Sequence, residues 1–416
     1  MLFRSPPRTL SGGGANRALS SSSNGLEKRP KLRFPGFDGP IKSAHLSQYL
    51  VENKERNKNL IYTKSDVLSV SGEYGIINQI EFQGRSFAGE SVAEYHVVET
   101  NDIVYTKSPL KANPYGIIKV NNGAPGIVST LYAVYHPCEG TVAEYIDYYF
   151  GNDLRLNKYL KPLVNIGAKH DMKVNNETVL TGEVYFPGYS EQKKIVGFLT
   201  ILDERIRQQR NLVEALKKYK RGLLSNLFGE KITQGCTTKS YYFSEIAQRR
   251  SEKYDPTSGI EYPCVELENI EQETGKILST VPSTAQSSIK NIAKSGDTLF
   301  GKLRPYLRKY AFAQKTMACS SEIWALIPSD AVLPKFLFYL VQTEQFLRVA
   351  NISSGTKMPR AEWSNIEKTE FFIPDPFVQR KVVSLLEGLD QKITFADSAL
   401  FSLNRLKASL MQQLFI

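Results

Sequence analysis

Basic and aromatic residues gather without any acid in one window of the sequence, "TLFGKLRPYLRKYAFAQKTMACSS" at 298–321. Lysine and arginine bind phosphate oxygens, arginine also binds guanine edges, and planar rings stack on bases and sugars. The residues of this window with the right chemistry for contacting a nucleic acid are Lys302, Arg304, Tyr306, Arg308 and Lys309. A solvated basic loop without a ligand would have the same composition, so a second observation is needed.

That second observation is another acid-free window, at 103–138, earlier in the chain. It carries Lys107, Lys111 and Lys119, together with Asn113, whose amide suits an adenine edge. Because the acid-free gap recurs at corresponding places, binding is favoured over an incidental loop. A nucleic acid is the ligand that this chemistry favours.

The two windows belong to an internal repeat that extends over the chain. "KSAHLSQYL" resembles "KSYYFSEIA", and "ETNDIVYTKSP" resembles "KSGDTLFGKLR" further along. In the second of these pairs, Asp102 aligns with Asp297 and Lys107 with Lys302. A third pair, "VSTLYAVY" and "SSEIWALI", aligns Tyr132 with Trp324.

Two long amphipathic segments, 186–228 and 373–415, align without a gap at an offset of 187 residues. Apolar residues recur in both at spacings of three and four, which is typical of a coiled-coil seam. About 38 helical residues would extend roughly 57 Å. The predicted seam includes Leu199, Leu202, Ile206, Leu216, Lys220, Leu386, Leu389, Ile393, Leu403 and Lys407.

The same seam position holds a lysine in both segments, Lys220 and Lys407. A half-buried charge in a seam fixes the register at some cost in stability. Alternatively, each lysine extends its ammonium group out of the seam and specifies nothing. Two such seams in one chain pair most simply with each other, in antiparallel orientation, and would set two domains at opposite ends of a rod.

Between the helical segments, short β-branched and aromatic runs are interrupted by Gly, Pro and Asn, which is typical of mixed, mostly β domains. The predicted fold class is therefore α+β: two such domains separated by two long helices that form an antiparallel coiled coil, with an approximate two-fold internal repeat. The predicted boundaries are a disordered tail at 1–27, domains at 28–185 and 236–372, and helices at 186–235 and 373–416.

Composition narrows the class of protein further. The net charge is +11, with the excess in the N-terminal tail and the first helical segment, so a polyanionic partner is plausible. Four scattered cysteines (Cys138, Cys236, Cys264, Cys319) predict neither disulfides nor a zinc site and indicate a reducing compartment. No apolar run reaches the roughly 18 residues of a membrane span, so a cytoplasmic protein without membrane contact is expected.

Sequence motifs for catalysis are missing. There is no phosphate-binding G-x-x-x-x-G-K-[ST] loop and no G-x-G-x-x-G fingerprint, and we predict no catalytic or metal-binding residue. Asp375, Asp390 and Lys392 loosely resemble a nuclease motif, but Gly188 stands at the place of Asp375 in the first repeat. A stand-alone nuclease is one alternative, and a purely structural coiled-coil adaptor is another.

The chain resembles the DNA-specificity subunit of type I restriction–modification systems. The resemblance lies in the junctions "VYFPGYSEQKKIVGFL" and "FFIPDPFVQRKVVSLL", the helix ends "KRGLLSNLF" and "KASLMQQLF", and the segments "KLRFPGF" and "GDTLFGKLRPYL". It covers roughly residues 28–416. The acidic residue usual before the junction glutamine is present as Glu191 but is Val378 in the second copy.

The resemblance implies that each domain is a target-recognition domain for one half of an asymmetric, two-part DNA sequence, bound in the major groove. The helices would set the spacer between the halves. Two methyltransferase subunits and two ATP-driven restriction subunits would be the protein partners. S-adenosylmethionine, ATP and magnesium would belong to those partners, and the chain itself would have no cofactor and no active site.

Overall fold

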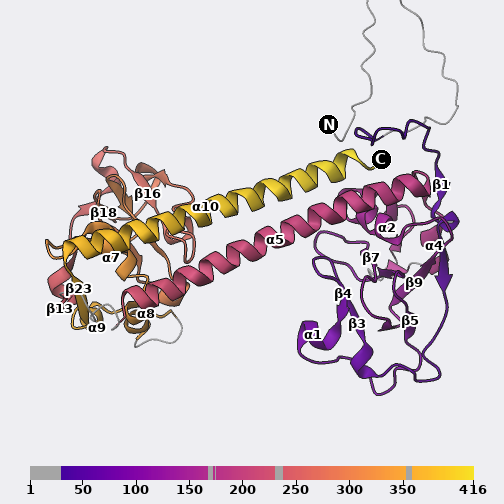
Figure 1. The fold of residues 1–416 in the computed structure, drawn as a ribbon, viewed down its shortest axis with the longest axis horizontal. Coiled ribbons are helices and arrows are strands. Elements are labelled where there is room, and N and C mark those ends of the chain that lie inside the picture. Colours follow the sequence, from indigo (N-terminus) through magenta and orange to yellow (C-terminus); the bar gives the residue numbers. More distant parts are fainter. Residues whose placement is uncertain (1–29, 167–171, 174, 230–237, 353–357) are drawn as a thin grey trace, which may run out of the picture. The chain divides into compact units, whose positions relative to one another are not determined.

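The computed structural model describes residues 30–166, 172–173, 175–229, 238–352 and 358–416. The tail predicted at 1–27 lies outside these residues, as do 230–235 of the first predicted helix. The chain divides into two compact units. Unit 1 is Met1–Arg207 with Phe401–Ile416, and unit 2 is Gln208–Leu400. Both mix short strands and helices, so the predicted α+β class is confirmed (Figure 1).

Unit 1 contains a four-stranded antiparallel sheet in the order β2-β9-β6-β7. Its central strands bury Val104 and Val134 completely, and these residues pack with Val98 and Val128 from the neighbouring β5-β8 pair. Further two-stranded pairs are β1-β12, β3-β4 and β10-β11. The bounds are β1 Ala44–His45, β2 Leu50–Asn53, β3 Leu68–Ser71, β4 Gly75–Asn78, β5 His96–Val98, β6 Ile103–Thr106, β7 Ile118–Val120, β8 Gly126–Val128, β9 Tyr132–Pro137, β10 Asn165–Ile166, β11 Met172–Lys173, β12 Glu183–Val184, α1 Gln79–Gln83, α2 Ala143–Phe150, α3 Asp153–Leu160 and α4 Asn176–Leu180.

Unit 2 contains a four-stranded antiparallel sheet in the order β14-β22-β19-β20 and a five-stranded sheet in the order β15-β18-β21-β16-β17, while β13 pairs with β23. Its main core lies between the four-stranded sheet, α7 and α8, where Phe300, Phe336 and Phe346 are fully buried. The bounds are β13 Thr238–Tyr242, β14 Ala247–Arg249, β15 Lys253–Tyr254, β16 Pro263–Val265, β17 Val281–Pro282, β18 Lys290–Ala293, β19 Thr298–Gly301, β20 Tyr310–Phe312, β21 Met317–Cys319, β22 Ile323–Pro328, β23 Glu370–Pro374, α6 Phe243–Ile246, α7 Pro334–Leu340, α8 Glu344–Ala350 and α9 Trp363–Ile366.

The aligned aspartates have the same structural role in both units. Asp102 precedes β6 and accepts a hydrogen bond of 2.8 Å from the backbone of Glu99, three residues earlier. Asp297 precedes β19 and accepts one of 2.8 Å from the backbone of Lys294. Both aspartates are almost fully buried, because each closes the turn that leads into the second strand of its sheet.

The strand register corrects one residue match made from the sequence. Tyr105 and Phe300 each lie three residues after the turn aspartate, so they occupy equivalent places. Ala133 lies opposite Tyr105, and Trp324 lies opposite Phe300. Trp324 therefore corresponds to Ala133 and not to Tyr132, because a gapless sequence alignment cannot detect a one-residue shift between two diverged strands.

The two long helices are α5, Tyr189–Leu227, and α10, Pro376–Gln413. In unit 2 the Gln209 amide donates to the backbone oxygen of Ala396 at 2.9 Å, and Lys220 lies 2.7 Å from Asp390. Residues later in α5 thus contact residues earlier in α10, which confirms antiparallel pairing there (Figure 1). Of the predicted seam, Leu199, Leu202, Ile206, Leu386, Leu389 and Ile393 are buried, while Leu216 and Leu403 are half-buried.

The repeated Leu-Phe pair that follows each helix packs into a domain core. The ring of Phe228, after α5, lies 4.8 Å from Phe336 in unit 2. The ring of Phe415, after α10, lies 5.2 Å from Tyr145 in unit 1. These aromatic contacts bury large apolar surface, so each domain core is completed by the end of a long helix.

Candidate functional site

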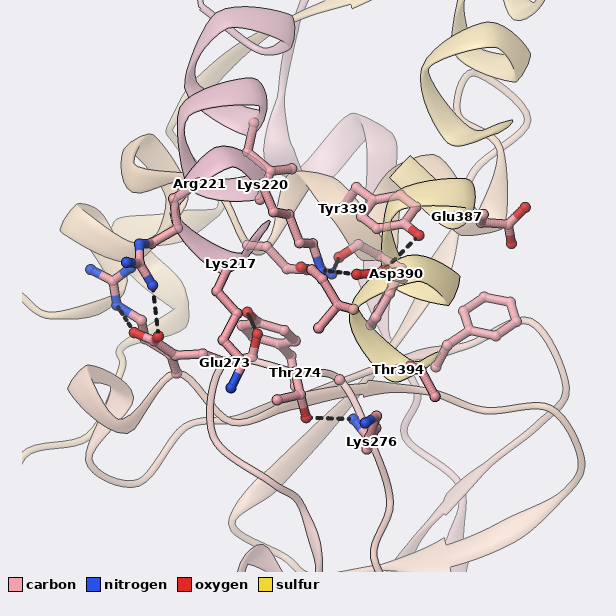
Figure 2. A pocket seen from close by; sticks show the side chains of 18 of the residues that line it. Lys217, Lys220, Arg221, Glu273, Thr274, Lys276, Tyr339, Glu387, Asp390 and Thr394 are labelled. Atoms are coloured by element: carbon pink, nitrogen blue, oxygen red, sulfur yellow. Dashed lines mark hydrogen bonds and ion pairs between the residues drawn. The ribbon is translucent and has the colours of Figure 1, made fainter. Parts of the chain in front are cut away.

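A lysine, an aspartate and a tyrosine from three elements meet in unit 2 (Figure 2). The ammonium group of Lys220 on α5 lies 2.7 Å from the carboxylate of Asp390 on α10. The hydroxyl of Tyr339 on α7 donates to the same carboxylate at 2.9 Å, and Lys220 also lies 5.5 Å from the centre of the Tyr339 ring. We call this set the unit 2 node; it ties both helices to α7 of unit 2.

Unit 1 contains an equivalent node with the helices exchanged. Lys407 on α10 lies 2.5 Å from the carboxylate of Asp203 on α5. Tyr148 on α2 donates to Asp203 at 2.8 Å, and Lys407 lies 5.7 Å from its ring centre. Burial is the largest cause that raises the pKa of the Tyr148 hydroxyl, so the hydroxyl keeps its proton and donates it to the carboxylate.

These nodes decide between the two interpretations of the seam lysines. The side chain of Lys220 is only 7% exposed and that of Lys407 is 32% exposed, and each ends on an aspartate of the facing helix. The lysines therefore do not extend freely into solvent. A specific partner on the facing helix favours the interpretation that they fix the register.

A second link between helix and domain also occurs in both units. Gln379, in the first turn of α10, accepts a hydrogen bond of 2.8 Å from the backbone of Leu333, the residue before α7, and donates to the backbone of Pro374 at 2.9 Å. Gln192 in α5 does the same with Val142, before α2, and with Pro187. Both glutamines are fully buried, so the junction motif is a structural joint.

The junction differs between the copies at the residue before the glutamine. Glu191 is buried and accepts two hydrogen bonds of 2.7 Å from the Arg33 guanidinium. Val378 stands there in the second copy and packs against the apolar core of unit 2. The acid therefore serves to hold the segment around Arg33, and the second copy holds an apolar contact instead.

Beside the unit 2 node lies a hollow of about 690 Å³ with many charged side chains (Figure 2). Its cations are largely paired with its acids: Arg221 lies 3.4 Å from Glu273, and Arg308 lies 2.7 Å from Glu344. The pairing neutralises the hollow locally, so it lacks the excess positive charge that a phosphate site needs.

The predicted DNA-contacting residues of unit 2 do not form one surface. Arg304 and Tyr306 are exposed on the short turn Pro305–Leu307, which is flanked by Arg304 at φ 52° and Arg308 at φ 49°. Positive φ at two non-glycine residues is strained, and such strain is concentrated at functional loops. This turn therefore remains a candidate contact.

The other predicted residues of the window have partners within unit 2. Arg308 binds Glu344 beside the first hollow, and the ammonium group of Lys309 donates to the backbone of Leu267 at 2.6 Å. Lys302 lies 3.9 Å from Glu322 and faces a different hollow. The residues are adjacent in sequence, but their strand and turn direct them to separate places.

That second hollow, of about 490 Å³, is the most basic concave site that we describe in unit 2. Lys302 lines it together with Arg249, Arg250 and Lys253, and with the rings of Trp324 and Trp363; we call it the basic hollow. Sequence reasoning found only Lys302 here. The adjacent pair Arg249–Arg250 was a visible signal, but Glu245 and Glu252 nearby excluded it from any acid-free window.

In unit 1, the predicted residues also separate. Lys111 is exposed, and Lys107 is half-buried near Arg56, where burial lowers its pKa. Lys119 lies 3.6 Å from Asp147. Asn113 is buried and donates to Asp153 at 2.9 Å, so the prediction that it contacts a base is not supported: the amide is used inside the domain.

The residues of the nuclease-like motif have other roles. Asp375 caps α10 by accepting hydrogen bonds from the backbones of Phe377 and Val378 at 2.8 and 3.1 Å. Asp390 belongs to the unit 2 node, roughly 22 Å further along the helix. A carboxylate cap and a node so far apart cannot bind one metal ion together, and no cluster of three potential metal ligands occurs among the described residues.

Two free cysteines of the described residues, Cys264 and Cys319, are buried. Burial raises the pKa of the Cys264 thiol to about 11 and that of Cys319 to about 12, which keeps both protonated and unreactive. None of the helices that the structure describes combines the length and the hydropathy required to cross a bilayer.

Comparison with known proteins agrees with this geometry. Residues 243–399 match the family described as the type I restriction modification DNA specificity domain. The specificity subunit of the HindI type I restriction enzyme from Haemophilus influenzae is 26% identical over 198 residues, which are 43% of this chain and 40% of that protein. The chain thus matches less than half the length of this curated relative.

Solved structures share the fold over nearly the whole chain. The S subunit of a type I restriction–modification system from M. genitalium superposes with a TM-score of 0.54 at 15% identity, covering 94% of this chain and 99% of that one. A structure on complex assembly and conformational transition of the type I R-M system gives 0.53 at 16%, covering 90% and 97%.

The fold, with its two domains and two long helices, is that of the type I restriction–modification specificity subunits. Within this fold, residues 243–399 match the type I restriction modification DNA specificity domain, and part of the chain is similar to the HindI specificity subunit.

Proposed function

We propose that the chain is the DNA-recognition subunit of a type I restriction–modification complex, with no active site of its own. Each domain binds one half of a two-part target sequence in the major groove. The long helices set the number of base pairs between the halves. The complex acts in the cytoplasm.

The observation that carries this proposal is a contrast within the repeat. The attachment of domain to helix is the same in both units: a buried glutamine and a Lys–Asp–Tyr node. The side chains beside Lys107 and Lys302 differ, with Glu52 in unit 1 at the place of Arg249 in unit 2. The two domains are thus attached to the helices in the same way but carry different side chains on the compared surface. This contrast supports two domains that bind two different half-sites.

The proposed partners follow from the class. Two methyltransferase subunits dock on the repeated helices, since a repeated surface suits two identical partners, and two restriction subunits join through them. S-adenosylmethionine, ATP and magnesium are bound by those partners. Exposed apolar side chains on the helices, such as Tyr219 and Leu406 at equivalent positions, support a docking role for these surfaces.

The test is to express the chain with a methyltransferase subunit of a type I system in a host without other DNA methylation, and to sequence the methylated adenines of its genome. We expect a single motif with two specified halves and an unspecified spacer. A host that shows no such motif, although the complex assembles, would refute the proposal. Cleavage of DNA by the purified chain with magnesium alone would support the nuclease alternative.

A further inference from the structure

Arg249, the last residue of β14, lies over two aromatic rings in the basic hollow. Its guanidinium carbon lies 4.8 Å from the centre of the Trp363 ring and 5.9 Å from that of Trp324. These are the two tryptophans of the whole chain. An arginine over a tryptophan face is attracted by the ring quadrupole, so the side chain is restrained although it is exposed.

The strand register explains why these residues meet. Arg249 lies opposite Leu326 on β22, and Trp324 lies two residues from Leu326 on the same face. Diagonal neighbours of this kind are within reach of long and aromatic side chains. Trp324 and Trp363 contact each other edge-on, with ring centres 5.6 Å apart, and each also packs on a fully buried phenylalanine, Phe300 or Phe243. The rings therefore form a rigid support.

The contacts with the two rings use no hydrogen bond, so the N–H groups of the guanidinium keep their capacity to donate. No described residue accepts a hydrogen bond from the Arg249 side chain. The neighbouring Arg250 is different, because it donates two hydrogen bonds of 2.7 and 2.8 Å to Asp297 and serves the domain itself. The guanidinium of Arg249 is thus restrained by two rings, and its N–H groups have no acceptor among the described residues.

The surroundings of this donor pair suit an anionic polymer. Lys253, which donates to Asn291 at 2.6 Å, and Lys302 line the same hollow, and Ser321 adds a short polar group. Such a concentration of cations attracts the phosphate backbone. The planar fork itself matches a guanine edge, whose O6 and N7 accept two parallel hydrogen bonds, and this pairing is the commonest specific contact between proteins and the major groove.

We propose that Arg249 specifies a guanine in the half-site bound by unit 2, donating its two N–H groups to O6 and N7 of that base. The inference rests on the proposed function and names a determinant of its specificity. Because the fork is already oriented by Trp324 and Trp363, little side-chain freedom is lost on binding.

At the equivalent places, the described residues of unit 1 hold other side chains. Glu52 occupies the place of Arg249, and Ala133 occupies the place of Trp324. A carboxylate cannot donate to guanine O6 and N7, so the effect of changing Arg249 is confined to one half of the target.

The experiment uses the full chain assembled with its methyltransferase, acting on duplexes in which the half-site for unit 2 is randomised. Arg249→Lys keeps the charge and removes the fork, and Arg249→Ala removes both. Arg348→Ala, an exposed arginine of α8 in the same unit, is the matched control. Circular dichroism checks that each variant is folded, since Arg249 contacts both tryptophans and its replacement alters their fluorescence directly.

We expect both Arg249 variants to lose discrimination at one G·C pair by roughly 5- to 150-fold, with the other half-site unchanged and the control like the wild type. Full discrimination retained in Arg249→Lys would overturn the inference. So would a uniform loss of methylation on all sequences, which indicates a phosphate contact, or a wild-type half-site without guanine. If the wild type shows no two-part motif, the proposed function fails and the inference with it.

Discussion

The two nodes differ in burial, and this predicts unequal costs for the same substitution. Asp390→Ala leaves Lys220, whose side chain is 7% exposed, without its anion, and leaves the Tyr339 hydroxyl without its acceptor. Removing one partner of a buried ion pair costs about 3–5 kcal/mol. Since the Asp390 side chain is 29% exposed and water can reach the gap, we expect about 2–3 kcal/mol.

Asp203→Ala is the matched comparison in unit 1. Both side chains of that pair, Asp203 and Lys407, are about a third exposed. An exposed pair of this kind contributes up to about 1 kcal/mol. The gain in helix propensity from Asp to Ala is the same at both positions and cancels in the comparison.

The assay is urea unfolding of the full chain followed by tryptophan fluorescence. Both tryptophans, Trp324 and Trp363, lie in unit 2, so the signal reports that unit. With a slope of about 2–3 kcal/mol per molar urea, Asp390→Ala should lower the midpoint by about 1 M. Asp203 lies in unit 1, so the cost of Asp203→Ala is measured by hydrogen exchange of that domain and should be no more than about 1 kcal/mol.

The reasoning is refuted if Asp203→Ala costs unit 1 as much stability as Asp390→Ala costs unit 2, or if Asp390→Ala leaves the tryptophan midpoint unchanged. A rescue experiment adds Lys220→Met to Asp390→Ala. Because the destabilisation comes from an unpaired buried charge, removing that charge should restore part of the lost stability. A double variant less stable than Asp390→Ala alone would contradict this cause.

Three further predictions concern the spacer, a buried histidine and the helix end. Duplicating seven residues after Leu212 and after Ala399, between the nodes, adds about 10.5 Å to each helix and should lengthen the unspecified spacer by about 3 base pairs, as read from the methylated motif; an unchanged spacer would count against the proposed role of the helices. Burial lowers the pKa of His96 to about 4, so below pH 6.5 the unfolded chain binds a proton that the folded chain does not. The free energy of unfolding should therefore fall as the pH drops from 6.5 to 4, by about 1–2 kcal/mol at pH 5. His96→Gln should lack this loss when urea titrations at pH 6.5 and pH 5 are compared. Phe415→Ala should destabilise unit 1 by about 3 kcal/mol, while Phe228→Ala, at the less buried equivalent position, should cost less in unit 2, as measured by hydrogen exchange of each domain.

The sequence predicted the helices well because their signal is local and long. A spacing of three and four over nearly forty residues, with Lys220 and Lys407 in register, depends only on helix geometry. The turn aspartates Asp102 and Asp297 were also visible, since a turn is fixed by neighbouring residues. The strand map was not predictable, because β6 pairs with β9 although β7 and β8 lie between them in the sequence, and the local pattern does not specify such a pairing.

The candidate contacts were predicted less well, for reasons of side-chain direction. Composition identified Asn113 as suitable for a base, but only the fold shows that its amide binds Asp153. Arg249 was missed because its importance depends on Trp324 and Trp363, which are distant in sequence and meet it only after the sheet forms. Charge in a window is a property of the sequence, whereas orientation of a donor is a property of the packed domain.

The division of the chain into units has a consequence for the order of folding. Unit 2 is one continuous segment, Gln208–Leu400, but unit 1 joins Arg207 and earlier residues to the last sixteen, Phe401–Ile416. Arg155 donates to the backbone oxygen of Ile416, a contact across 261 positions, and Leu32 donates to that of Gln413. During synthesis, unit 2 can therefore complete its fold first, although its sequence follows most of unit 1. The domain that is made first must wait, with Tyr145 and its neighbours uncovered, for the final residues of the chain.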